Sequence, residues 1–148
     1  MKKITLFILS LLIVFTIQAQ DWVQIGQDID GDTMNVGFGE SLSLNADGSI
    51  LAVGGPHFER NSGYVKIYQN NSENWIQIGQ TINPEAEKDY FGRSICLNSD
   101  GSIIAIGAIS NDENGESAGN VRVYENLDGI WTQIGQDIDG EAADDMSG

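Results

Sequence analysis

Apolar and polar residues alternate in short segments along most of this chain. At 41–45, Leu42 and Leu44 lie on one face of a predicted strand and Ser43 on the other. Residues 50–54 are apolar on both faces, which is typical of a strand buried between two neighbours. Residues 64–68 and 75–80 alternate again. Since no window of about 12 residues beyond residue 19 has helical periodicity, the pattern predicts an all-β protein.

The predicted strands occur twice, because the sequence repeats itself. Residues 38–54 match 91–107 without a gap, and 64–68 match 120–124 after a loop that is three residues longer. A shared motif, Trp-x-Gln-Ile-Gly-Gln-x-Ile, begins at spacings of 53 and 56 residues, at Trp22, Trp75 and Trp131. The length change falls in a loop, where a repeated structural unit tolerates insertions.

Four antiparallel strands every 53–56 residues are typical of β-propeller blades. A β-sandwich rarely repeats so faithfully, and the coils of a β-solenoid are usually shorter. We therefore predict a partial β-propeller over residues 20–148, with two full blades and parts of two others. The predicted parts are the last strand of a closing blade plus a connector at 20–37, blades at 38–80 and 91–136, and the start of the next unit at 137–148.

Closed propellers have about 4 to 8 blades, so we expect this chain to be a fragment of a larger propeller. Additional blades of a longer parent chain are then its expected partners. Residues 22–27 are expected to close the ring, and without further blades the chain should self-associate through its open faces.

The repeated motifs carry a family resemblance. Phe38-Gly39 followed by Gly54-Gly-Pro, and Phe91-Gly92 followed by Gly107-Ala-Ile, resemble the FG-GAP repeat of integrin-type propellers. The Trp-x-Gln-Ile-Gly opening and the Asp-Gly-Ser turn resemble the bacterial FG-GAP-like variant more closely. The resemblance covers the whole chain after residue 19. It implies a secreted or surface protein that serves as a scaffold for adhesion or recognition.

The N-terminal segment has the pattern of a secretory signal peptide. Lys2 and Lys3 precede an apolar run at 4–17, and Ala19 provides a small residue for cleavage. The run is shorter than the roughly 20 residues of a membrane-spanning helix, and it has no cysteine for a lipoprotein anchor. We predict a signal peptide at 1–19 and a protein that is secreted, periplasmic or at the cell surface. No membrane span is expected after cleavage.

The charge and the cysteine content exclude further classes of partner and of protein. The 148 residues include 7 Lys+Arg and 22 Asp+Glu, a net charge of -15, which disfavours nucleic acids and anionic membranes as partners. A hydrophobic content of 41% argues against a disordered acidic tail. The single cysteine, Cys96, excludes an internal disulfide. Because it replaces Ser43 in the repeat, we expect a small packed residue that is buried or unreactive.

The resemblance implies calcium as the metal to consider, since integrin-type blades hold it in an Asp-x-Asp-x-Asp-Gly loop. Here the corresponding loops, 45–49 and 98–102, each contain one carboxylate, so we predict hairpin turns. The acidic runs at 28–32 and 137–141 lose two of three carboxylates in the middle copy, which favours solvated turns over metal binding. The weak candidate metal ligands are in the lengthened loop: Asp112, Asn114 and Glu116. No other cofactor is indicated.

Catalytic patterns are missing from the sequence. His57 is the only histidine and has no matched nucleophile, and no phosphate loop, dinucleotide fingerprint, zinc spacing or carboxylate pair occurs. The three tryptophans recur at one blade position, which favours packing between blades over carbohydrate stacking. We predict a non-catalytic module that recognises a protein or glycan. The alternative is the propeller portion of a secreted polysaccharide-active enzyme whose catalytic residues lie outside this chain.

Overall fold

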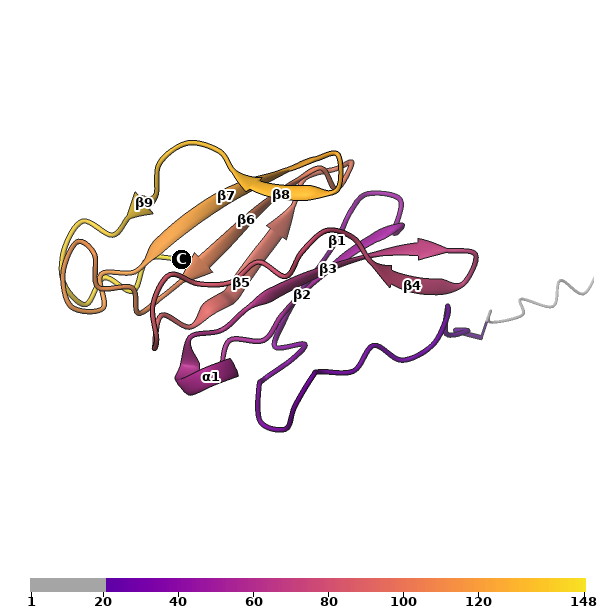
Figure 1. The fold of residues 1–148 in the computed structure, drawn as a ribbon, viewed down its shortest axis with the longest axis horizontal. Coiled ribbons are helices and arrows are strands. Elements are labelled where there is room, and N and C mark those ends of the chain that lie inside the picture. The colour runs from indigo at the N-terminus through magenta and orange to yellow at the C-terminus, as the bar shows by residue number, and fades with distance from the viewer. Residues whose placement is uncertain (1–20) are drawn as a thin grey trace, which may run out of the picture.

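The computed structural model of the protein describes residues 21–148 and contains two antiparallel β-sheets (Figure 1). In both sheets the strands lie side by side in chain order. The first sheet comprises β1 (Ser41–Leu44), β2 (Ile50–Gly54), β3 (Val65–Asn71) and β4 (Asn74–Gln77). The second comprises β5 (Phe91–Leu97), β6 (Ile103–Ala108), β7 (Asn120–Leu127) and β8 (Ile130–Gln133), with β9 (Ile138–Asp139) pairing with β7. The all-β prediction is confirmed, and the sheets are consistent with propeller blades. The predicted signal peptide lies outside the described residues.

The only helical segment in residues 21–148 is α1 (Phe58–Asn61), a single irregular turn. Glu59 and Arg60 have positive φ angles of 40° and 60°, so the turn is not a regular α-helix. This agrees with the lack of helical periodicity in the sequence. None of the helical structure described is long and apolar enough to cross a membrane.

The Asp-Gly loops between the first two strands of each sheet are hairpin turns held by their own side chains. Asp47 accepts a hydrogen bond from the Ser49 amide at 2.9 Å, and Asn45 accepts one from the Ile50 amide at 2.9 Å. The loop at 98–102 repeats both bonds. Hydrogen bonding to Ser49 lowers the pKa of Asp47, because it stabilises the carboxylate. Each carboxylate therefore closes a turn.

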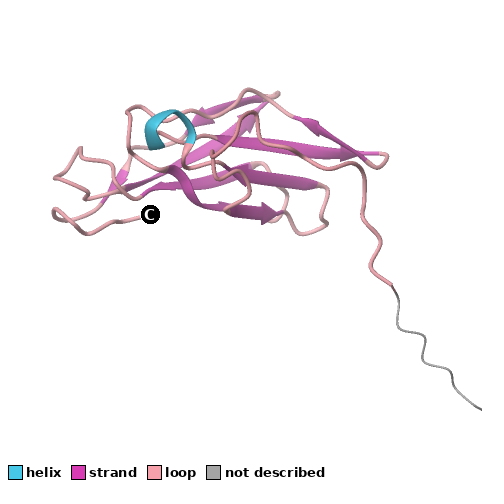
Figure 2. Ribbon diagram, turned by 90° about the horizontal axis from the view of Figure 1, so that it is seen from below, coloured by secondary structure: helices cyan, strands magenta, loops and turns pink. Residues whose placement is uncertain are grey.

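The two sheets pack face to face, with β1 and β2 against β5 (Figures 1 and 2). Two hydrogen bonds cross the interface: the Ser41 hydroxyl donates to the Gly92 carbonyl at 2.6 Å, and the Leu97 amide donates to Ser43 Oγ at 2.9 Å. The buried core includes apolar side chains of both sheets: Ala52, Val65, Ile67, Ile82, Phe91, Leu97, Ile104, Ile106, Ala108 and Trp131. Small side chains on β1 thus let the two backbones approach closely.

The segment that follows each sheet pairs with the third strand of that sheet, at the same repeat positions in both sheets. Val65 bridges to Ile82 after the first sheet, and Val121 pairs with Ile138 after the second. Similarly, the parallel bridge of Gly63 to Phe91 recurs between residues 119 and 147. The structural repeat therefore extends to the last residues of the chain.

Residues 22–27, which we predicted as a strand, form no strand among the described residues. A strand needs a neighbour for its backbone hydrogen bonds, and residues 21–148 form no third sheet that could provide one. Trp22 is fully exposed, whereas Trp131 at the equivalent position is buried. Closure of a ring by this segment stays a prediction.

Candidate functional site around Arg122

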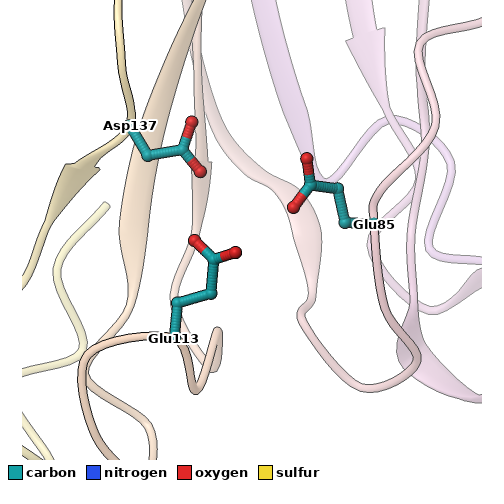
Figure 3. Close-up of side chains that lie close together, drawn as sticks. All are labelled: Glu85, Glu113 and Asp137. Carbon is teal, nitrogen blue, oxygen red and sulfur yellow. The ribbon is translucent and has the colours of Figure 1, made fainter.

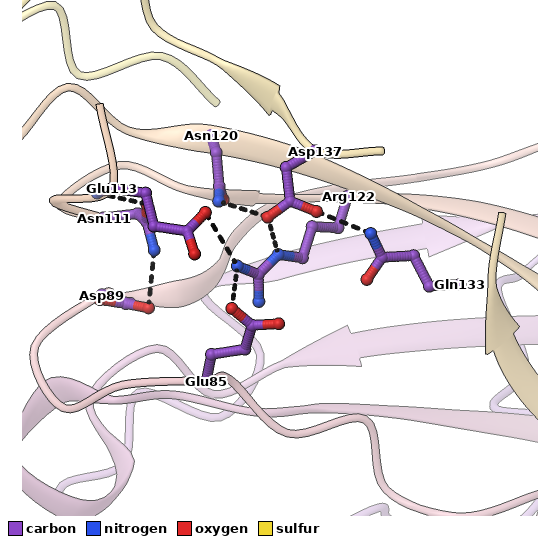
Figure 4. Close-up of polar contacts among 8 residues, drawn as sticks. All are labelled: Glu85, Asp89, Asn111, Glu113, Asn120, Arg122, Gln133 and Asp137. Carbon is purple, nitrogen blue, oxygen red and sulfur yellow. Dashed lines mark hydrogen bonds and ion pairs between the residues drawn. The ribbon is translucent and has the colours of Figure 1, made fainter. Parts of the chain in front are cut away.

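The most concentrated group of charged side chains surrounds Arg122, in the middle of β7 (Figure 4). Only 2% of the Arg122 side chain is exposed. Its Nε donates to Asp137 Oδ2 at 2.6 Å, and its Nη2 donates to Glu85 Oε2 at 2.7 Å. A Glu113 oxygen lies 3.9 Å from the same Nη2. One buried cation is therefore shared by three carboxylates.

These carboxylates come from three separate segments (Figure 3). Glu85 belongs to the connector between the sheets, Glu113 to the loop before β7, and Asp137 to the segment before β9. One oxygen of each lies within 4.8 Å of the others, which is close enough to hold a metal ion. The Arg122 cluster, as we call these four residues, thus fastens the connector to the second sheet.

Arg122 and Asp137 form a mostly buried ion pair, with 2% and 17% of their side chains exposed, whereas Glu85 and Glu113 are more than half exposed. Burial by itself lowers the pKa of Arg122, but the hydrogen bond and charge of Asp137, together with Glu85, outweigh it and raise that pKa. Desolvation and the charges of Asp137 and Glu85 raise the pKa of Glu113. Glu113 is therefore the carboxylate that the guanidinium compensates least.

Two amide side chains complete the hydrogen bonding of Asp137. Gln133 Nε2 donates to Asp137 Oδ1 at 2.6 Å, and Asn120 Nδ2 donates to Asp137 Oδ2 at 3.1 Å. The Oδ1 atom of Asn120 is buried and has no hydrogen-bond partner among the described residues. Because Asp137 already accepts from three donors, a metal ion would have to displace N–H groups from it. The arrangement favours an ion-pair junction over a metal centre.

A simpler form of this junction occurs in the first sheet. Lys66, at the repeat position of Arg122, donates to Asp32 at 2.6 Å, and Asp32 is at the repeat position of Glu85. In both cases the third strand carries a base and the segment before the sheet carries an acid. Aligning the repeats could have revealed this pairing, which we did not predict. Asp28 is elsewhere, accepting a hydrogen bond from Gln24 at 2.8 Å.

The weak candidate metal ligands in the long loop point to different partners. Asp112 Oδ1 accepts from the Ser117 amide at 2.7 Å, while Asn114 Nδ2 donates to the Gly140 carbonyl at 2.7 Å. Asp112 and Glu116 line one groove together, without Asn114. The geometry thus gives Asp112 and Asn114 structural roles in their loop, and metal binding there stays a prediction.

A chelator should have little effect on the stability of the protein. With EDTA present, we expect the melting temperature to change by less than a few degrees, because Arg122 supplies the positive charge in the Arg122 cluster. Differential scanning calorimetry would measure the shift, with added calcium as the converse experiment. A large drop would show that a bound ion stabilises the native state.

His57 is held in a polar network at the interface of the sheets. Its ring nitrogens lie 2.9 Å from Glu40 Oε1 and 3.2 Å from Asn61 Oδ1, and its ring meets Tyr90 edge-on at 5.6 Å. Arg93 of the second sheet donates to the other oxygen of Glu40 at 2.7 Å. His57 therefore contributes to the junction of the sheets.

The tryptophan motif also joins neighbouring units. Trp131 Nε1 donates to the Ile78 carbonyl at 3.2 Å, and Trp75 Nε1 donates to the Ile25 carbonyl at 3.1 Å. The second glutamine of the motif binds the following tryptophan: Gln80 Nε2 donates to the Trp131 carbonyl at 2.7 Å. For Trp75 and Trp131 the contacts support packing between units.

The expectation that Cys96 is buried is wrong, because its side chain is exposed. Cys96 is at the repeat position of Ser43, whose hydroxyl faces the second sheet. The corresponding face of β5 points away from the first sheet, and no described residue forms a third sheet against it. Local alternation predicted the face of the strand correctly but not what covers it.

Residues 84–124 match the model of the FG-GAP repeat family. The matched segment begins in the connector, includes β5 and β6, and ends in the middle of β7. The chain therefore contains an FG-GAP repeat, as the Phe-Gly and Gly-Ala motifs predicted. A search of curated proteins finds no match to the chain.

Proposed function

We propose that this chain is part of an exported, non-catalytic β-propeller module that recognises a protein or a glycan. The FG-GAP repeat at 84–124 is typical of propeller-type recognition modules. In such a module the stacked sheets supply rigidity and the loops bind the ligand. The basic, apolar and small-residue order of the N-terminal segment supports export and, with it, a role in adhesion outside the cytoplasm.

The observation that carries the propeller in this proposal is the exposed face of the second sheet, on the side that points away from the first sheet. On the first sheet the face toward β5 is covered, and Ile82 is only 4% exposed. Its repeat counterpart Ile138 is 58% exposed, and Val121 and Val123 are only partly buried, unlike their counterparts Val65 and Ile67. The same apolar pattern is thus present on a face with no sheet against it. A further unit of the same repeat would bury it.

The face of the first sheet that points away from the second sheet also carries exposed apolar side chains. Leu42 and Leu44 are 61% and 57% exposed, whereas Leu97, the counterpart of Leu44, is buried beneath the neighbouring sheet. Each sheet therefore has two different faces, and one face of a sheet packs on the opposite face of the next. Units stacked in this head-to-tail way form rings or open arrays.

The charge pattern specifies what a further unit would carry. Asp32 and Glu85 each pair with a base on the third strand of the following sheet. Glu141 is at the same repeat position, and it is exposed. The proposed next unit therefore has a lysine or arginine on its third strand and a tryptophan at the start of its fourth.

The reactivity of Cys96 tests this proposal. In protein isolated from the producing cell, a maleimide should react with Cys96 slowly under native conditions and rapidly after unfolding in guanidinium. The physical reason is that a covering sheet denies the reagent access to the sulfur, as the second sheet partly covers the counterpart position Ser43. Mass spectrometry of the labelled protein would measure both rates.

A matched variant gives the reference for a covered thiol. Exchanging the two residues, with Ser43→Cys and Cys96→Ser, places the single thiol between the two described sheets, where Ser43 is partly buried, so it should react more slowly than the unfolded chain in any preparation. If native Cys96 reacts as fast as the unfolded chain, the face is open and the proposed propeller is wrong. Light scattering provides an independent measure, because residues 20–148 alone should self-associate through the uncovered faces.

A further inference from the structure

A groove formed by loops of both sheets has the chemistry of a sugar-binding site. Its volume is about 580 Å³, within the usual range of roughly 300–1,000 Å³ for ligand sites. Its walls come from three segments: the turn after β2, the connector before β5, and the long loop before β7. The groove therefore exists only when the two sheets are packed together. The lining residues are Arg60, Asn61, Lys88, Tyr90, Ser110, Asp112, Glu116 and Ser117.

Every lining side chain carries a hydrogen-bonding group, and one is aromatic. Asp112 and Glu116 supply acceptors, Arg60 and Lys88 supply donors, and the amide and hydroxyl groups supply both. Aliphatic side chains are missing from the lining, which disfavours an apolar ligand. A sugar presents several hydroxyls that each donate and accept, together with C–H groups that pack on an aromatic ring such as Tyr90.

The charges of the groove favour a neutral ligand. Two bases and two acids line it, in a chain whose net charge is -15. A strongly anionic ligand would meet the carboxylates of Asp112 and Glu116, and a cationic one would meet Arg60 and Lys88. Arg60 is also paired with Glu87, at 3.0 Å, which leaves Lys88 as the less compensated base. Neutral hydroxyl-rich molecules meet no such repulsion.

The groove is built on backbone that is both unusual and firmly held. Arg60, Asn61, Lys88, Tyr90 and Ser117 all have φ angles between 50° and 72°, a region that residues other than glycine rarely adopt. Such conformations persist where the surroundings impose them, and they cluster at functional sites.

Specific hydrogen bonds hold these segments in place. The Tyr90 amide donates to the Asn61 carbonyl at 2.8 Å, and the Ser117 amide donates to Asp112 at 2.7 Å. Behind the groove, buried Asp89 accepts from the Ser110 amide through its carbonyl and from Asn111 through its carboxylate. The backbone segments that carry the lining residues are thus held in place before a ligand arrives, which reduces the entropic cost of binding.

We propose that this groove binds neutral sugar units, with Tyr90 stacking on the ring and Asp112 and Glu116 accepting from its hydroxyls. This inference rests on the proposed recognition function and names the ligand class. A second groove, of about 510 Å³, shares Arg60 with the first. A peptide is the less suitable ligand, because the lining residues are in loops and offer no free strand edge for backbone pairing.

Saturation-transfer NMR on the full chain tests the proposal. The probes are neutral disaccharides (cellobiose, maltose, lactose and chitobiose), with digalacturonate and a Gly-Ser peptide for comparison. We expect signals from at least one neutral disaccharide, lost or weakened about tenfold in Tyr90→Ala but retained in Tyr90→Phe, because the phenylalanine keeps the stacking face.

A second variant guards against unfolding of Tyr90→Ala. Asp112→Asn keeps the oxygen that accepts from Ser117 and removes the charge, so the loop should fold while sugar binding weakens. Asp128→Asn, in the exposed turn between β7 and β8, is the matched control and should bind normally.

Two results would overturn the assignment. If sugar signals persist unchanged in Tyr90→Ala and Asp112→Asn, the sugar binds elsewhere, and the recognition function stands without this site. If only the peptide or digalacturonate binds, or no probe does, the groove is not a neutral-sugar site. Failure of the propeller itself is detected separately, by free reactivity of Cys96.

Discussion

Replacing Arg122 with methionine should lower the free energy of unfolding by about 3–5 kcal/mol, the usual cost of removing one partner from a buried ion pair. The substitution would leave Glu85, Glu113 and Asp137 within 4.8 Å of one another without a compensating cation. Lysine should restore little, because its single ammonium group cannot bind Asp137 and Glu85 in the fork geometry of a guanidinium. Urea denaturation followed by tryptophan fluorescence would measure the change.

The loss should depend on pH in a definite direction. Desolvation and the charges of Asp137 and Glu85 already raise the pKa of Glu113, and loss of Arg122 removes the charge that opposes this shift, so the folded variant binds protons more readily. The deficit should therefore be largest near neutral pH and shrink as the pH falls through the raised folded-state pKa of Glu113 toward its unfolded value.

Lys66→Met is the matched control for Arg122→Met. It removes the equivalent pair in the first sheet, in which the acid is the half-exposed Asp32 and not a carboxylate as buried as Asp137, so it should cost only about 0–1 kcal/mol. Equal losses of unfolding free energy in the two variants would show that the contribution of Arg122 to stability does not depend on its burial. Calcium should be omitted from all buffers, so that no added ion substitutes for the missing guanidinium.

Gly54→Val should destabilise the protein by about 2 kcal/mol or more, and Gly107→Val should have a similar effect. A Cβ atom at Gly54 would overlap the carbonyl oxygen of Gly92 on the neighbouring sheet and the hydroxyl of Ser41. At Gly107 it would overlap Ser94 and the backbone of Gly148. The Gly92 backbone cannot move aside without separating the sheets, whereas Gly148 belongs to no sheet. Thermal unfolding of both variants would measure the effect.

Gly39→Ala separates crowding from conformational strain. Gly39 has a φ of +91° but has no atom within 4 Å of its would-be Cβ, so only the left-handed conformation is penalised, by roughly 1–2 kcal/mol. Near-neutral results at both Gly54 and Gly107 would contradict the close packing of the sheets. A loss at Gly54 alone would indicate that the chain end at Gly148 yields to the added side chain.

Local pattern was sufficient to predict the strands. The alternation around Leu42 and Leu44, the Asp-Gly turns and the repeated tryptophan motif depend on neighbouring residues, so one sequence reveals them. The grouping of the strands into four-stranded antiparallel units followed from the period of the repeat, which is typical of propeller blades. The packing of Trp75 and Trp131 between units was likewise predicted, because an equivalent position makes the same contact where a neighbouring unit is present; Trp22, at the same repeat position, is exposed.

The Arg122 cluster and the loop groove could not be predicted in this way. Glu85, Glu113 and Asp137 are far apart along the chain. Alignment of the repeats could have paired Glu85 with Arg122, as it pairs Asp32 with Lys66, but nothing in the local sequence marks Glu113 or Asp137 as further partners. Likewise, Tyr90 and Asp112 line one groove only because the two sheets dock and bring a connector beside a loop.

The amino-acid sequence by itself determined the repeat, the strand pattern and the resemblance to FG-GAP units, because each is encoded at short range. The tertiary structure alone decided which charges meet, which backbone positions are crowded and which faces remain open. Cys96 illustrates the difference: alternation specifies the side of β5 on which its thiol lies, but exposure depends on whether another sheet covers that side. Burial is a property of the neighbours of a residue in space, and those neighbours are chosen by long-range packing.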